Sequence, residues 1–160
     1  MIEIDRMMMK DYHIDLMIMM ENAGGKLAQH ARNMFNNNII DKKIVILAGK
    51  GNNGGGGLVA ARHLFNWGDN VCINIKNPEK LKKIPSKQID IDRRIGIKII
   101  DETDLSNYDL IIDALIGYNL RGDPREPIAT IINRANNSRT PILSLDIPSG
   151  LDSTSGDSYD

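Results

Sequence analysis

Residues 44–64 read IVILAGKGNNGGGGLVAARHL, an apolar run followed by a glycine-rich segment and a second apolar segment. Lys43–Ala48 is a short β-branched run bounded by turn residues, which is typical of a buried strand. Behind the glycines, apolar side chains recur at helical spacing, and a glycine follows as a stop signal. These residues are Leu58, Ala61, Leu64, Phe65 and the terminating Gly68. The stretch therefore predicts a strand, a glycine loop and a helix in succession.

The rest of the chain continues this alternation. A helical pattern fills much of residues 1–35, residues 78–94 suggest a weak helix plus a loop broken by Pro85, and a helix begins at Pro127. Further strands are expected in NVCINI (70–75), GIKII (96–100), DLIIDALIG (109–117) and PILSLDIPSG (141–150). Because no hairpin signal joins the strands, the pattern predicts an α/β fold with a doubly wound, mostly parallel sheet.

Composition narrows the class of protein. The 160 residues are enough for one domain, with 41% hydrophobic and 26% charged residues, as in globular proteins. A net charge of -1 gives no electrostatic case for nucleic acid or an acidic membrane, and no run is long enough to span a bilayer. The single Cys72 lies in an expected strand, which indicates a buried, inert thiol and a reducing compartment. We expect a cytoplasmic protein.

The amino-terminal segment is rich in methionine. Six of these residues (Met7, Met8, Met9, Met17, Met19 and Met20) fall within residues 7–20. They can fill irregular gaps in a core or form a subunit interface. From Met20 onward, helical spacing predicts an apolar face through Ala23, Leu27, Ala31 and Met34. Gly24 and Gly25 argue against an unbroken helix there.

The glycine segment Gly49–Gly57 contains GKGNNG, which satisfies the pattern G-x-G-x-x-G. No Lys-Ser or Lys-Thr pair follows, which excludes a Walker-type phosphate loop. Lys76 stands at the end of the second strand, where an NAD dehydrogenase carries an acid, so that class is disfavoured. A tight turn needs only one or two glycines. The density therefore favours bare N–H groups that meet an anionic ligand at a helix N-terminus.

Two carboxylates are expected at the same edge of the sheet. Asp113 interrupts the fourth apolar run and Asp146 ends the fifth. A carboxylate inside an apolar strand is costly unless it is paired or bound to a cation. Asn53 and Ser149 add neutral oxygens, and an oxygen-only set suits a hard cation better than zinc. A helix cap or a turn is the plainer explanation of either aspartate alone.

Four blocks together resemble the YjeF N-terminal domain family, the NAD(P)H-hydrate epimerases. They are MENAG (20–24), AGKGNNGGGGLVAARHL (48–64), IDALIGYNLRGDPREP (112–127) and LSLDIPSGLDSTSG (143–156). The resemblance spans residues 1–160. It implies a Rossmann-like three-layer α/β/α fold, usually as a homodimer. The implied activity interconverts the R and S epimers of hydrated NADH and NADPH (NADHX and NADPHX), which is metabolite repair upstream of a fused or separate dehydratase.

The resemblance also implies site residues. Asn52, Asn53, Gly54, Gly55 and Gly56 would contact the substrate, together with Gly117, Tyr118, Asn119, Leu120, Arg121, Gly122, Asp123 and Asp146. Asn53, Asp113 and Ser149 would hold a potassium ion.

Three features depart from the family pattern. Gly56 replaces an aspartate of the usual GNNGGDG loop, Gly117-Tyr118-Asn119 replaces G-T-G, and relatives continue beyond residue 160. The chain is therefore expected to be a fragment of a longer protein or to have an incomplete sheet with an exposed edge. Loss of the aspartate leaves open an alternative function, a catalytically inactive nucleotide-binding or dimerisation module.

Epimerisation at the hydrated carbon needs proton transfer to the departing hydroxyl and from the incoming water. Asp146 is the candidate for this role, while Asp113 would stay ionised beside the cation. His13, His30 and His63 are expected on the surface.

Overall fold

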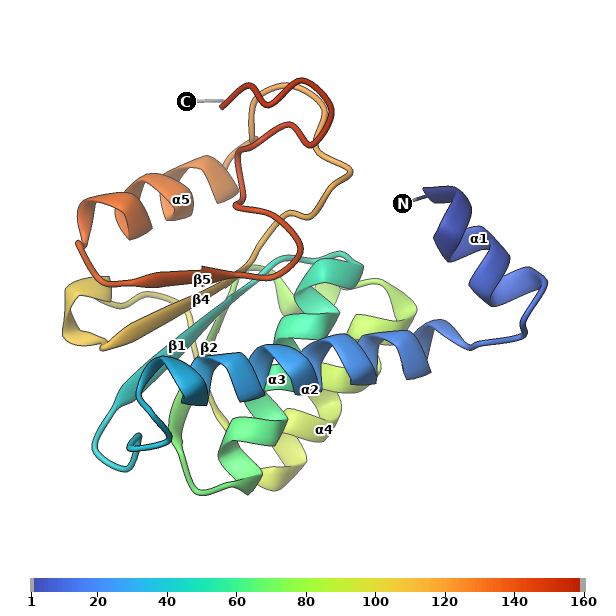
Figure 1. Cartoon of the computed structure of the whole chain (residues 1–160). Helices are drawn as coiled ribbons and strands as arrows, with labels where there is room; N and C mark the ends of the chain where they lie inside the picture. The colour runs from blue at the N-terminus through green and yellow to red at the C-terminus, as the bar shows by residue number, and fades with distance from the viewer. Residues whose placement is uncertain (1, 159–160) are drawn as a thin grey trace.

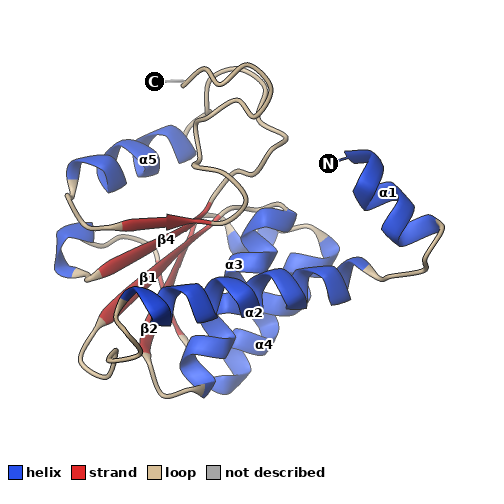
Figure 2. Ribbon diagram, viewed as in Figure 1, coloured by secondary structure: helices blue, strands red, loops and turns tan. Residues whose placement is uncertain are grey.

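The computed structural model describes residues 2–158, which form a five-stranded parallel sheet with helices on both faces (Figures 1 and 2). The strands are β1 (Lys43–Ala48), β2 (Asn70–Ile75), β3 (Lys98–Ile100), β4 (Leu110–Ala114) and β5 (Ile142–Ser144). Their spatial order is β3-β2-β1-β4-β5, so the direction of winding reverses between β1 and β4. The α/β, doubly wound, Rossmann-like architecture expected from the sequence is confirmed.

Helices form the outer layers. They are α1 (Ile2–Lys10), α2 (Leu16–Met34), α3 (Asn52–Asn66), α4 (Lys83–Ile95) and α5 (Ile128–Asn137), with short 3-10 turns at Pro78–Lys80 and Leu105–Asn107. Figure 1 shows α2, α3 and α4 on one face of the sheet and α5 on the other, while α1 stands apart from the layers. None of the helices among the described residues combines the length and hydropathy that a membrane span requires.

Alternation along β1 feeds two separate cores. Ile44 and Ile46 pack in the cluster that includes α2 and α3, whereas Val45 and Leu47 pack in the cluster under α5. All four side chains are buried, as expected for a central strand covered on both faces. β4 alternates in the same way, and Asp113 is paired in register with Leu47.

The glycines of α3 mark a close approach to α2 and the sheet. A Cβ atom at Gly57 would lie 2.6 Å from Cβ of Ala114, and one at Gly54 would lie 1.8 Å from the carbonyl oxygen of Gly49. On the opposite side, a Cβ atom at Gly24 of α2 would lie 2.5 Å from Cβ of Val59. The helix thus fits between its neighbours only because these side chains are absent.

Two helix predictions need correction. Gly24 and Gly25 do not interrupt α2, and the buried face includes Gly24 and Ala28 in place of Ala23 and Met34, which are exposed. A loop and a helix do share residues 78–94, but Pro85 does not break the helix: it lies in the first turn of the 13-residue α4, where no intrahelical partner for its missing N–H is needed.

The methionines of the amino-terminal segment differ in burial, and only the core-filling role is seen in the described part of this chain. Met20 is buried in the core, whereas Met7 and Met9 on α1 are exposed.

The expected burial is confirmed for Cys72 but not for His63. Cys72 is buried as predicted, and burial raises the pKa of its thiol. His63 was wrongly expected on the surface: it is half-buried, and its Nε2 lies 2.8 Å from Oε1 of Glu21, which also pairs with Arg62.

Replacing the α2 glycine tests the close helix contact. Gly24→Ala should lower the free energy of unfolding by about 1–3 kcal/mol, because the new methyl group overlaps Val59. Gly25→Ala is the matched control, since its Cβ atom would lie an ordinary 3.5 Å from Nε2 of His63. That variant should gain about 0.5–1 kcal/mol from helix propensity. Denaturant unfolding measures both, and equal effects would contradict the packing explanation.

Asp92 of α4 is a fully buried carboxylate without a hydrogen-bond partner among the described residues. Desolvation raises its pKa to about 7, although the nearby Arg62 guanidinium acts in the opposite direction. The folded chain therefore keeps a proton that the unfolded chain loses above its ordinary pKa of about 3.9. The unfolding free energy is therefore highest below about pH 3.9, as far as it depends on Asp92, and it falls as the pH rises from there toward 7.

Asp92→Asn should remove this pH dependence. Between pH 5 and pH 8 the native chain should lose roughly 2–3 kcal/mol of unfolding free energy more than the variant. Asp90→Asn, an exposed substitution on the same helix, is the control and should follow the native profile. Chemical denaturation at the two pH values measures the difference, and parallel profiles for Asp92→Asn would contradict the assignment.

Candidate functional site

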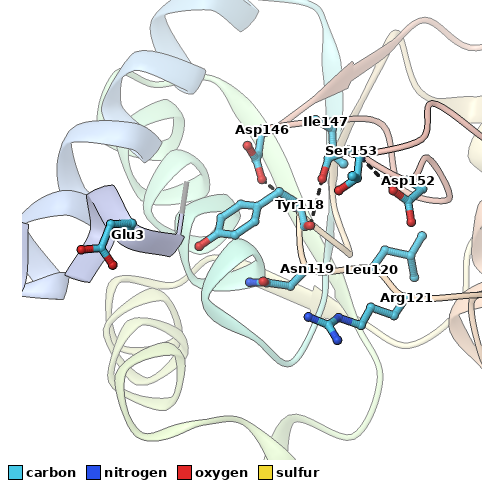
Figure 3. A pocket seen from close by; sticks show the side chains of 10 residues that line it. Glu3, Tyr118, Asn119, Leu120, Arg121, Asp146, Ile147, Asp152 and Ser153 are labelled. Atoms are coloured by element: carbon cyan, nitrogen blue, oxygen red, sulfur yellow. Dashed lines mark hydrogen bonds between the residues drawn. The ribbon is translucent and has the colours of Figure 1, made fainter. Parts of the chain in front are cut away.

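The carboxyl edge of the sheet carries a cavity of about 640 Å³ (Figure 3). Its walls come from α1, from the loop after β4 and from the segment after β5. The lining residues are Glu3, Tyr118, Asn119, Leu120, Arg121, Asp146, Ile147, Asp152, Ser153 and Thr154. A cavity of this size suits a small-molecule ligand.

Asp146 occupies a constrained place in the cavity wall. Its backbone has a φ of 73°, in the left-handed region that non-glycine residues rarely adopt. Its Oδ2 accepts a hydrogen bond of 2.8 Å from the backbone N–H of Tyr118. A Cβ atom at Gly117 would lie 2.8 Å from the same oxygen and 3.3 Å from Oδ1 of Asn53. Asn53, Gly117 and Asp146 therefore converge, and a side chain at residue 117 would have to displace one of the other two.

Tyr118 connects the cavity loop to α1. Its hydroxyl donates a 2.6 Å hydrogen bond to Oδ2 of Asp5, and this bond raises the pKa of Tyr118. Its backbone carbonyl accepts a hydrogen bond from Oγ of Ser153. The loop that departs from the family pattern at Tyr118 is thus held from both ends of the chain.

Asp113 lies on the α5 side of the sheet and accepts four hydrogen bonds. Its Oδ1 receives Oγ of Ser149 at 2.6 Å and the N–H of Leu115 at 3.1 Å. Its Oδ2 receives the N–H of Ser149 at 2.8 Å and Oγ of Ser144 at 3.1 Å. The same carboxylate borders a smaller cavity of about 190 Å³. The strand carboxylate is therefore fully paired, which removes the cost of burying it.

The three residues implied as potassium ligands fit that ion in part. Asp113 and Ser149 provide oxygens around one negative charge, as a monovalent hard cation requires, but protein donors already occupy both Asp113 oxygens, so an ion would have to replace one of these hydrogen bonds. No group of three or more His, Cys, Asp or Glu residues within 2–158 could hold a metal, so a zinc-type set is missing there. Asn53 shares no hydrogen bond with Asp113 or Ser149 in the described chain, and its Nδ2 is buried without a partner. Two of the three proposed ligands are thus brought together.

The glycines implied as substrate contacts have another role in the structure. Gly54, Gly55 and Gly56 are buried, and none of them is among the residues that line the large cavity. A Cβ atom would meet Gly49 at Gly54, Met20 at Gly55 and Leu145 at Gly56. Close packing therefore gives these three residues a structural reason to be glycine, and their contact with substrate stays a prediction.

Only some of the remaining residues predicted to contact the substrate line the large cavity. Tyr118, Asn119, Leu120 and Arg121 line the cavity with Asp146, as expected for a ligand loop. Asn52, Gly122 and Asp123 are exposed and lie outside its lining.

Several lining residues were missed from the sequence. Asp152, Ser153 and Thr154 lie in the DSTSG motif, which is itself a signal that they belong to the site. Glu3 carries no such signal, because it reaches the site only through the position of α1.

Comparison with known proteins shows which family this chain resembles. The family described as YjeF-related protein N-terminus matches residues 16–160. An NAD(P)H-hydrate epimerase from Dehalogenimonas lykanthroporepellens is 37% identical over 156 residues, covering 96% of this chain and 64% of the relative. A bifunctional NAD(P)H-hydrate repair enzyme Nnr from Moorella thermoacetica is 32% identical, covering 96% of this chain and 31% of that protein. The chain thus spans less than two thirds of these relatives.

A solved structure shares the fold. The crystal structure of yeast ynu0, YNL200c, superposes with a TM-score of 0.85 at 28% identity, covering 94% of this chain and 68% of the yeast chain. The family match over 145 residues (16 to 160) and the 37% identical relative lead to one conclusion: the chain belongs to the YjeF-related protein N-terminus family.

Proposed function

We propose that the protein interconverts the R and S epimers of NADHX and NADPHX, the hydrated forms of NADH and NADPH. Family membership supports this activity, as do relatives named NAD(P)H-hydrate epimerase in bacteria and in Dictyostelium discoideum. The single observation that carries the proposal is the position of the Asp146 carboxylate. This carboxylate is held by the N–H of Tyr118 in the wall of a cavity large enough for part of a dinucleotide.

The reaction needs no redox partner. The lone pair of the ring nitrogen expels the hydroxyl group from the hydrated carbon and leaves a planar iminium, and water then adds from the opposite face. An acid must protonate the departing oxygen, and a base must deprotonate the water that adds from the opposite face. Asp146 is exposed to the cavity and retains an oxygen, Oδ1, that the Tyr118 N–H does not engage. We assign this proton transfer to Asp146.

Binding and orientation fall to the loop after β4. Asn119 and Arg121 line the cavity beside Asp146 (Figure 3). Arg121 can provide planar, charge-assisted hydrogen bonds to a phosphate, and Asn119 can donate to or accept from a ribose hydroxyl or the carboxamide. The hydroxyl of Tyr118 is already hydrogen-bonded to Asp5, so we expect Tyr118 to position the loop and not to take part in proton transfer.

Potassium is part of the proposal. Asp113 and Ser149 would hold the ion, and Asn53 is the third expected ligand. A bound cation would supply positive charge beside the smaller cavity that Asp113 and Ser149 border. The protein atoms themselves hold the two segments together through the four hydrogen bonds of Asp113.

The assembly and setting are further proposals. The exposed apolar residues Ile4, Met7 and Met9 of α1 support a homodimer. A dehydratase, fused or separate, would consume the S epimer, and relatives named bifunctional repair enzymes support this partner. The single buried thiol of Cys72 fits the reducing cytoplasm.

Asp146→Asn tests the proton-transfer role. The amide keeps an oxygen to accept the Tyr118 N–H but cannot exchange a proton, so kcat for epimer exchange should fall by about 10²–10⁴-fold. Chiral separation of the NADHX epimers over time measures the rate. Asp41→Asn makes the same chemical change at an exposed position just before β1 and should leave the rate unchanged.

Two outcomes of that assay would overturn the proposals. Turnover by Asp146→Asn at the native rate would remove Asp146 from the mechanism. Failure of the native chain to accelerate exchange at all would favour the inactive binding module.

Thermal unfolding in two different salts tests the potassium proposal without measuring turnover. KCl at ten times its dissociation constant should stabilise the native chain by about 1.4 kcal/mol relative to choline chloride, because the ion binds only the folded state. For a chain of this size, that is a rise in Tm of roughly 4 °C. Ser149→Ala should lose the difference in Tm between the two salts. Ser86→Ala, at an exposed position of α4, should retain that difference. Equal Tm values for the native chain in both salts would exclude a potassium site.

A further inference from the structure

A second cavity, of about 550 Å³, lies at the point where the winding of the sheet reverses. Its walls are the loop Gly49–Gly51 after β1, the segment after β2, and the residues that lead from β4 into α5. These segments leave the sheet at its carboxyl edge (Figure 1). In doubly wound folds this crevice is the usual place for a nucleotide. The residues that line it are separate from those of the cavity around Asp146.

Positive charge is concentrated around this second cavity. Five cationic side chains line it, against one carboxylate, in a chain whose net charge is -1. The cations are Lys50, Lys76, Lys80, Lys82 and Arg125, and the carboxylate is Glu126. Cations gathered from three separate segments raise the local potential and attract an anion.

Most of these cations lack a protein partner. Lys76 is paired with Asp101 at 2.6 Å and with Glu102 at 3.5 Å. The other four, Lys50, Lys80, Lys82 and Arg125, form no ion pair with any described residue. Glu126 accepts a hydrogen bond from Thr130. The charge facing the cavity is therefore not neutralised from within the protein.

The floor of the cavity adds two features. Gly51 is the N-cap of the 15-residue helix α3, and no side chain caps that end, so its free N–H groups and dipole favour an anion. Ala48, Leu115, Ile116 and Ile128 provide an apolar surface beside the cations. An apolar floor with a cationic rim suits a nucleoside that carries phosphate groups.

The segment after β2 narrows the ligand class. In dinucleotide-binding folds, the residue at this position contacts the adenosine ribose: an acid binds a free 2′-hydroxyl, and a cation accommodates a 2′-phosphate. Here Lys76, Lys80 and Lys82 line the cavity from this segment, and no acid of the segment does. The charges match a 2′-phosphate and not a free hydroxyl.

One chain segment separates the two cavities. Leu115 and Ile116 line the cationic cavity, and Tyr118 and Asn119, two residues further on, line the cavity around Asp146. We propose that the cationic cavity binds the 2′-phosphorylated adenosine end of the substrate, so that the protein prefers NADPHX to NADHX. The substrate preference rests on the proposed epimerase function, whereas the binding site itself does not.

Binding of adenosine fragments tests the site without catalysis. Isothermal titration of the full chain should show adenosine 2′,5′-bisphosphate binding at least about tenfold more tightly than 5′-AMP or inorganic phosphate. The double variant Lys80→Gln/Lys82→Gln should lose about tenfold in affinity for the bisphosphate and most of its preference over 5′-AMP. The double variant Lys26→Gln/Lys87→Gln has the same charge change at exposed positions outside the cavity and should bind like the native chain.

Different binding results would contradict the site and the 2′-phosphate assignment. No binding of the bisphosphate, or equal binding by Lys80→Gln/Lys82→Gln and the native chain, would exclude this cavity as the site. Equal affinity for the bisphosphate, 5′-AMP and inorganic phosphate would show a general phosphate site and overturn the 2′-phosphate assignment.

Epimer exchange separates this inference from the proposed function. Lys80→Gln/Lys82→Gln should raise KM for NADPHX about tenfold with little change in kcat or in KM for NADHX. Bisphosphate binding by a chain that does not epimerise either substrate would leave the binding site standing and overturn the proposed function. Exchange of both substrates with equal kcat/KM would support the function and overturn the NADPHX preference.

Discussion

The close packing of α3 between α2 and the sheet is the constraint on which the rest of the structure depends. Gly57 allows the helix to touch Ala114 of β4, and Gly24 allows α2 to touch Val59 from the other side. A helix with ordinary side chains in these positions would be displaced by the width of a methyl group or more, and a dense core has no room for such a shift. Helix α3 is accordingly buried on nearly all sides of its first half.

This packing also brings the functional loops together. A Cβ atom at Gly49 would lie 2.0 Å from the carbonyl oxygen of Leu115, so the loop after β1 lies directly against the segment after β4. Gly117 extends the same contact to Asn53 and Asp146. The crevice at the reversal of strand order is therefore built from backbone in close contact. The lysine-lined cavity lies at this crevice, and the segment 115–119 connects its wall to the wall of the cavity around Asp146.

Hydrogen bonds complete the arrangement where packing ends. Asp113 binds Ser144 and Ser149 as well as the N–H of Leu115, and so joins the ends of β4 and β5 to the turn that follows. Oγ of Ser149 in turn accepts the N–H of Ile116. Each bond to a buried carboxylate is charge-assisted and stronger than a neutral one. Asp146 is positioned by this framework in a left-handed backbone conformation, a form of strain that often marks functional sites.

Sequence by itself determined the order of strands and helices, because hydrophobic periodicity and glycine punctuation are local signals. The runs at Lys43–Ala48 and Asn70–Ile75 and the helix after Pro127 all lie where those signals place them. Its motifs also named Asp146 and the loop from Tyr118 to Arg121 as site residues, and these do meet at one cavity. Only the tertiary structure decided that Gly54, Gly55 and Gly56 are closely packed, that Glu3 of α1 reaches the site, and that lysines from separate loops face a common cavity. The physical reason is that periodicity reports which face of an element is buried, whereas a cavity depends on the distances between elements that are far apart in the chain.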